Sequence, residues 1–87
     1  MDVTYPILQI NQDRTFDMYD SEIDILRTLE DWENQSEGIW LIDYEGYFLD
    51  GVVSMVYQKV ELRRSDIRFD QIFLREQFER MRQLRNR

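Results

Sequence analysis

The chain contains no cysteine and no histidine among its 87 residues. The absence of cysteine excludes disulfide bonds, thiolate metal sites and thiol nucleophiles. The absence of histidine removes a common general base, and the two absences together exclude most of the common catalytic triads. A catalytic site would have to rely on carboxylates, hydroxyls, lysine or tyrosine. We therefore expect a protein that is not an enzyme and that needs no cofactor and no metal.

Long apolar runs are also missing. No stretch approaches the roughly 18 apolar residues that a membrane-spanning helix needs. The first residues lack the basic start and apolar core of a secretory signal. We expect a soluble, cytoplasmic protein that does not bind membranes. A chain of this length forms one domain, residues 1–87, with a single modest core.

Acidic side chains are concentrated in the first part of the chain. Residues 1–50 contain thirteen acidic side chains but only two basic ones, Arg14 and Arg27. From Gly51 onward nine basic side chains accompany five acidic ones, and the net charge of the whole chain is −7. Such a chain can neutralise part of its charge internally and still present an acidic surface to a partner. The pattern favours binding over catalysis.

The first third of the chain predicts a β-hairpin and a helix. Residues 5–10 and 15–19 are rich in β-branched and aromatic side chains, and a polar turn separates them. Ser21 begins a capping-box pattern, and apolar residues recur every three positions as far as Trp32. We expect the helix to span residues 22–34.

All three glycines of the chain lie within residues 38–51, where they mark the turns of a β meander. A strand over residues 39–44 should lead through the two-residue connection Glu45-Gly46 into a returning strand over residues 47–49. This hairpin is the clearest local pattern in the chain.

The last part of the chain predicts a strand and a long helix. Asp50-Gly51 is typical of a bulge or short turn ahead of a strand over residues 52–62. Ser65 is the expected N-cap of a helix that runs to Arg87. The complete pattern predicts an α+β fold, with four or five antiparallel strands in the order ββ-α-ββ(β)-α and both helices on one face of the sheet.

An acidic surface anchored by two tyrosines is the expected functional site. Tyr44 and Tyr47 flank the predicted hairpin turn, and an exposed aromatic surrounded by acids has the chemistry of an interface hot spot. Opposite charge would steer a basic protein partner onto this surface, the logic of small immunity proteins, antitoxins and inhibitors. The predicted contact residues are Asp31, Glu33, Glu37, Asp43, Tyr44, Glu45, Tyr47 and Asp50.

The alternative function is a structural subunit that self-assembles. At about 100° per residue, apolar side chains cover about half the circumference of the last helix, which is more than one sheet contact requires. Phe78 and Met81 lie on this face. They are the residues expected to contact a second copy of the chain.

Two other kinds of site are less favoured. Asp43, Glu45 and Asp50 could hold a divalent cation, but acids beside glycine in tight turns are ordinarily solvated turn residues. The arginine-rich residues 80–87 could contact nucleic-acid phosphates. The net negative charge opposes this, and cations at a helix C-terminus already favour the helix dipole. Metal binding and nucleic-acid binding are therefore not expected.

Overall fold

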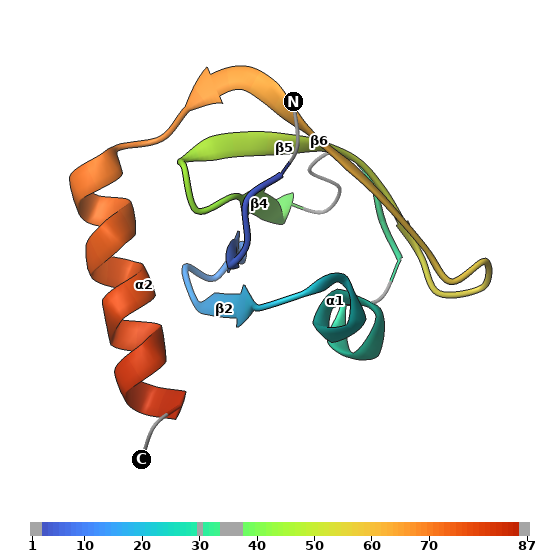
Figure 1. Ribbon diagram of the computed structural model, residues 1–87, viewed down its shortest axis with the longest axis horizontal. Helices are drawn as coiled ribbons and strands as arrows, with labels where there is room; N and C mark the ends of the chain where they lie inside the picture. Colours follow the sequence, from blue (N-terminus) through green and yellow to red (C-terminus); the bar gives the residue numbers. More distant parts are fainter. Residues whose placement is uncertain (1–2, 30, 34–37, 86–87) are drawn as a thin grey trace.

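The computed structural model describes residues 3–29, 31–33 and 38–85. These residues form an antiparallel six-stranded sheet and two helices, so the predicted α+β class is confirmed, with six strands where four or five were expected. In chain order the elements are β1 (Ile7–Ile10), β2 (Phe16–Tyr19), α1 (Glu22–Thr28), β3 (Trp32–Glu33), β4 (Trp40–Ile42), β5 (Tyr47–Ser54), β6 (Lys59–Arg68) and α2 (Gln71–Arg85) (Figure 1).

Strand β5 connects the two parts of the sheet. The strand order is β2-β1-β4-β5-β3, and β6 also pairs with β5. One edge of β5 pairs with β4 near its start and with β3 near its end, whereas β6 pairs along the other edge. The hairpin made by β5 and β6 therefore runs from the α2 end of the molecule to a tip on the far side (Figure 1).

The two helices pack on different faces of the sheet. Successive residues of a strand point to opposite faces, and both members of the apolar pair Ile7-Leu8 in β1 are fully buried. The expectation that both helices share one face is wrong, because apolar pairs of this kind require cover on both sides. The cluster packed with α1 contains Ile7, Tyr19, Ile25, Leu29, Trp32, Leu41, Leu49 and Val53, and the cluster packed with α2 contains Leu8, Met18, Ile42, Leu74 and Phe78.

Helix α1 begins where the sequence predicts but ends early. The Asp24 amide donates to the Ser21 hydroxyl at 3.3 Å, which is the expected cap. The helix ends at Thr28, before Trp32, which lies buried in β3. Ile25 is the fully buried side chain of the helix. The apolar residues that recur every three positions therefore continue beyond the end of the helix into strand β3.

The turn between β4 and β5 matches the predicted hairpin. The Gly46 amide donates to the Asp43 carbonyl at 2.9 Å, and the Asp43 amide donates to the Tyr47 carbonyl at 3.0 Å. Gly46 has a φ of +93°, in the region that favours glycine. Four residues, Asp43 to Gly46, separate β4 from β5 instead of the two expected, because Asp43 and Tyr44 lie outside β4.

The predicted strand over residues 52–62 is in fact the third hairpin of the chain, formed by β5 and β6. β5 ends at Ser54, a turn occupies residues 55–58, and β6 follows. Gly51 pairs with Leu62 inside this ladder and is not in a bulge, and the register shift lies instead between Tyr47 and Leu49. The turn contains no glycine, proline, asparagine or aspartate, so composition provides no signal for it.

Helix α2 starts later than predicted because β6 continues through Ser65 to Arg68. The hydroxyl of Ser65 accepts from the Ile67 amide at 3.1 Å within the strand and caps no helix. The cap is supplied by Asp70, whose Oδ1 accepts from the amides two and three residues ahead at 2.9 and 3.2 Å.

Candidate functional site

The predicted contact residues do not form one surface. Asp43, Tyr44, Glu45 and Tyr47 lie at the turn that leads into β5, Asp50 lies within β5, and Asp31 and Glu33 lie beside its far end. Val53, which pairs with β3, lies six residues after Tyr47 at the start of β5. At roughly 3.3 Å per residue, the two groups of predicted contact residues are therefore about 20 Å apart. Glu37 lies outside the described residues.

Asp43 is a structural residue. Its side chain is completely buried. Oδ1 accepts from the Tyr47 amide at 3.0 Å, and Oδ2 accepts from the Thr4 amide at 3.2 Å and from Arg64 Nε at 2.7 Å. The carboxylate thus joins the N-terminal segment, the turn and β6. In this fold the Asp43 side chain, predicted to contact a partner, presents no accessible surface.

The two tyrosines at this turn lie beneath arginines. The guanidinium of Arg75 lies 3.7 Å from the ring centroid of Tyr44, and those of Arg64 and Arg68 lie 4.6 and 4.9 Å from the ring centroid of Tyr47. Cations in this position are attracted to the faces of the rings. Neither ring is the exposed aromatic surrounded by acids that the sequence predicts, because the basic second part of the chain folds over both.

The acids beside these tyrosines are close to basic side chains. Glu45 Oε2 lies 4.0 Å from Arg75 Nη2, and Asp50 is directly opposite Arg63 in the β5–β6 ladder. Among the described residues, no three acidic side chains lie close enough together to hold a metal ion. At this turn the charges neutralise one another, as the split charge distribution suggested.

The other two predicted acids lie at the far end of β5. Asp31 Oδ1 accepts from the Met55 amide at 2.9 Å and so fixes the start of the hairpin turn. Glu33 of β3 and Glu61 of β6 pair with Val52 from its two sides. A groove of about 330 Å³ follows this end of the sheet. Its lining residues are Asp31, Trp32, Glu33, Val52, Val53 and Ser54.

The hairpin tip adds two exposed apolar side chains next to this groove. Val56 and Tyr57 are 79% and 80% exposed, at the turn that projects on the right of Figure 1. The turn is held by bonds from the amide and side chain of Gln58 to the Met55 carbonyl, at 3.3 and 2.7 Å. Neither apolar side chain is needed to hold the turn. Sequence reasoning missed this site because it placed both residues inside a strand.

The residues predicted for self-association are used by the fold itself. Phe78 is only 2% exposed and belongs to the core under α2, and Met81 packs against the same cluster. Phe78 therefore cannot contact a second copy of the folded domain. Leu74 and Phe78 bury this part of the α2 stripe against the sheet, whereas Phe73 and Leu84 of the same helix remain 38% and 60% exposed.

Within the described part of the chain, no helix is both long enough and apolar enough to cross a membrane. Comparison with protein-family models, with curated proteins and with solved structures finds no match for this chain. Its function is therefore inferred from the geometry of its surfaces.

Proposed function

We propose that this protein is a protein-binding module. It binds a basic partner at the far end of β5, through the groove lined by Asp31 and Glu33, here called the acidic groove, and the adjacent hairpin tip. The observation that carries the proposal is the pair of exposed side chains Val56 and Tyr57 at a projecting turn. Large aromatic side chains at such positions are the usual anchors of protein interfaces. They bury substantial apolar area once a partner covers them.

The charge beside the tip fits a basic partner. Asp31 and Glu33 are exposed on the groove, and Glu61 is exposed on the neighbouring strand, where Lys59 lies 3.2 Å from its carboxylate. Acids therefore exceed bases at this end, and the whole chain carries a charge of −7. Opposite charge accelerates the encounter with a basic protein. The proposed class is still that of an inhibitor, antitoxin or immunity protein. Val56 and Tyr57 are the side chains that would anchor the partner.

The first test is capture of partners from the native lysate at low and at high salt. The parent protein should retain a basic protein at low salt. Tyr57→Ser should lose most of that protein, because it removes the central anchor. Ile72→Ser is the matched control, since Ile72 is also exposed, at 76%, but lies on α2. No retained basic protein, or equal retention by Tyr57→Ser, would contradict the proposal.

Charge reversal then tests the groove. The double variant Glu33→Lys/Glu61→Lys should slow association with the captured partner by roughly tenfold at low salt, and the difference should shrink at high salt. Glu76→Lys/Glu79→Lys reverses two exposed acids on α2 and serves as the control. Equal rate constants for both double variants, measured by surface plasmon resonance, would place the partner elsewhere.

A further inference from the structure

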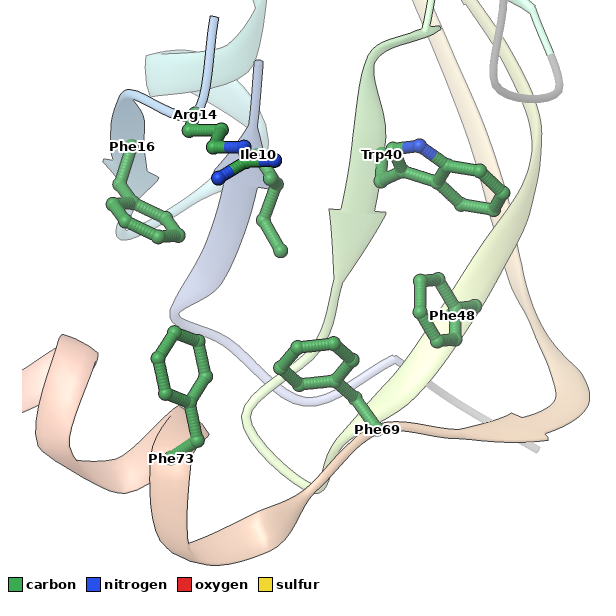
Figure 2. A pocket seen from close by; sticks show the side chains of 7 residues that line it. All are labelled: Ile10, Arg14, Phe16, Trp40, Phe48, Phe69 and Phe73. Carbon is green, nitrogen blue, oxygen red and sulfur yellow. The ribbon is translucent and has the colours of Figure 1, made fainter. Parts of the chain in front are cut away.

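A second hollow lies on the α2 face of the sheet. It has a volume of about 370 Å³ and opens between the β1–β2 turn, β4, β5 and the start of α2. Figure 2 shows five aromatic rings arranged around a central space, with Ile10 between them. The described residues that line it are Ile10, Arg14, Phe16, Trp40, Phe48, Phe69 and Phe73, here called the aromatic pocket.

The rings of the aromatic pocket support one another. Trp40 packs edge-on against Phe48 with ring centroids 5.2 Å apart, and Phe48 packs in the same way against Phe69 at 5.7 Å. Phe73 continues the chain at 5.6 Å from Phe69 and 6.3 Å from Phe16. Edge-to-face pairs of this kind are the favoured arrangement of aromatic side chains. The pocket is therefore formed by the fold before any ligand enters.

The aromatic pocket remains open to solvent on one side. Trp40 and Phe73 are 37% and 38% exposed although both rings pack against neighbours. Preformed, mostly apolar pockets of a few hundred Å³ with one well-placed polar group are typical of small-molecule sites.

Arg14 is the one charged residue among the described residues that line the pocket. It belongs to the turn between β1 and β2 and has a φ of +68°, which is uncommon for a residue with a side chain. The Arg14 amide donates to the Asn11 carbonyl at 2.9 Å, and the Asn11 amide donates to the Thr15 carbonyl at 2.9 Å. Sparsely populated backbone conformations of this kind are found preferentially at functional sites.

The guanidinium of Arg14 is available to a ligand. Within residues 3–29, 31–33 and 38–85 it makes no ion pair and no ring contact. The neighbouring Asp13 carboxylate accepts from the Thr15 hydroxyl at 2.6 Å and from the Thr15 amide at 3.0 Å. These two bonds hold the pKa of the Asp13 carboxyl below its usual range. Asp13 is thus engaged by Thr15.

We propose that the aromatic pocket binds a small aromatic carboxylate, with its planar body among the rings and its carboxylate on Arg14. Edge-to-face rings accept a flat aromatic body, and a guanidinium pairs with a carboxylate through charge-assisted hydrogen bonds. A basic protein segment is disfavoured here, because its cations would meet Arg14. The site is separate from the acidic groove at the hairpin tip and does not depend on the protein-binding proposal.

Titration calorimetry with two matched probes tests this inference. Naphthoate carries the carboxylate, and naphthalenemethanol has the same ring system without the charge. The full-length protein should bind naphthoate about tenfold more tightly than the alcohol, the effect of one hydrogen bond between charged groups. Arg14→Gln should remove this preference and leave the alcohol's affinity unchanged. Arg27→Gln, which removes the other arginine of residues 1–50, should preserve it.

Three results would overturn the proposal. If neither probe binds at millimolar concentration, the aromatic pocket is not a ligand site. If both bind equally and Arg14→Gln changes nothing, the pocket accepts apolar groups without selecting a carboxylate. Phe73→Ser should weaken both probes, and its thermal unfolding curve shows whether the domain still folds. Unchanged binding by a folded Phe73→Ser would place the probes elsewhere.

Discussion

At the scale of single residues, Gly46 and Gly51 have positive φ for different reasons. Gly46 has a φ of +93° in a turn, and a Cβ there would lie 1.8 Å from Gln71 Nε2, the mobile end of a side chain. Gly51 has a φ of +135° within β5, and a Cβ there would lie 1.8 Å from the Glu61 carbonyl oxygen. The second obstacle is the backbone of a paired strand, which cannot move without breaking the ladder.

We therefore expect Gly51→Ala to lower the free energy of unfolding by about 3 kcal/mol or more, because backbone strain and a backbone clash add together. Gly46→Ala should cost only about 1–2 kcal/mol, because Gln71 can turn away. Urea unfolding of both variants measures the difference. Equal losses would mean that β6 does not approach β5 at Gly51 as described.

At the scale of elements, the start of α2 depends on Asp70. Its carboxylate accepts from two of the first amides of the helix, whereas Ser65 bonds only within β6. Asp70→Ala should therefore lower the free energy of unfolding by about 1 kcal/mol, the usual effect of losing an N-cap. Ser65→Ala should cost less than half as much. The opposite order in urea unfolding would support the helix start that the sequence predicts.

The elements that sequence reasoning located correctly carry local signals. The first hairpin has a polar turn, the second has Gly46, and α1 has the Ser21 cap. The turn at residues 55–58 has no such signal, since the residue that adopts a positive φ there, +50°, is Gln58 and not a glycine, asparagine or aspartate. Besides the local bonds of Gln58, the Met55 amide at its start donates to Asp31, which lies 24 residues earlier in the chain. Tertiary contacts of this kind cannot be inferred from local composition.

Local sequence also gives no signal for the burial of Asp43. An aspartate beside a glycine turn is ordinarily solvated, and the burial of Asp43 depends on Thr4 and Arg64, which are 39 and 21 residues away in sequence. The same folding of the basic second part over the turn covers both predicted tyrosine anchors. The acids at Asp31 and Glu33 remained exposed because β3 lies at an edge of the sheet.

At the scale of the whole molecule, the two faces of the sheet have separate cores and separate surfaces. The α2 face carries the aromatic pocket, and the far end of β5 carries the acidic groove and the hairpin tip. The two sites also differ in the charge around them. Arginines of β6 and α2 cover the β4–β5 turn, whereas the far end of β5 is acidic. The two proposed sites therefore lie apart on the domain and would favour ligands of opposite charge.

The core on the α1 face makes the stability of the molecule sensitive to alkali. Burial, reinforced by the charge of Glu22, raises the pKa of Tyr5 to about 12. Burial, reinforced by the charge of Asp17, also raises the pKa of Tyr19 to about 12. Both values exceed the unfolded value of 10.0, so the folded state favours the neutral phenol. The stability that depends on these phenols is complete below pH 10 and is lost as the pH rises through 12.

Urea unfolding between pH 8 and pH 12 should therefore show a loss of stability that begins near pH 10. Tyr5→Phe/Tyr19→Phe should start from a lower stability at pH 8, because Tyr19 loses its buried hydrogen bond to Gln9. The double variant should then lose less stability than the parent at higher pH, because phenylalanine does not titrate. Tyr57→Phe, at the exposed tip, should keep the parent's alkaline loss. If the double variant and the parent fell in parallel, the two phenols would not be buried in this core.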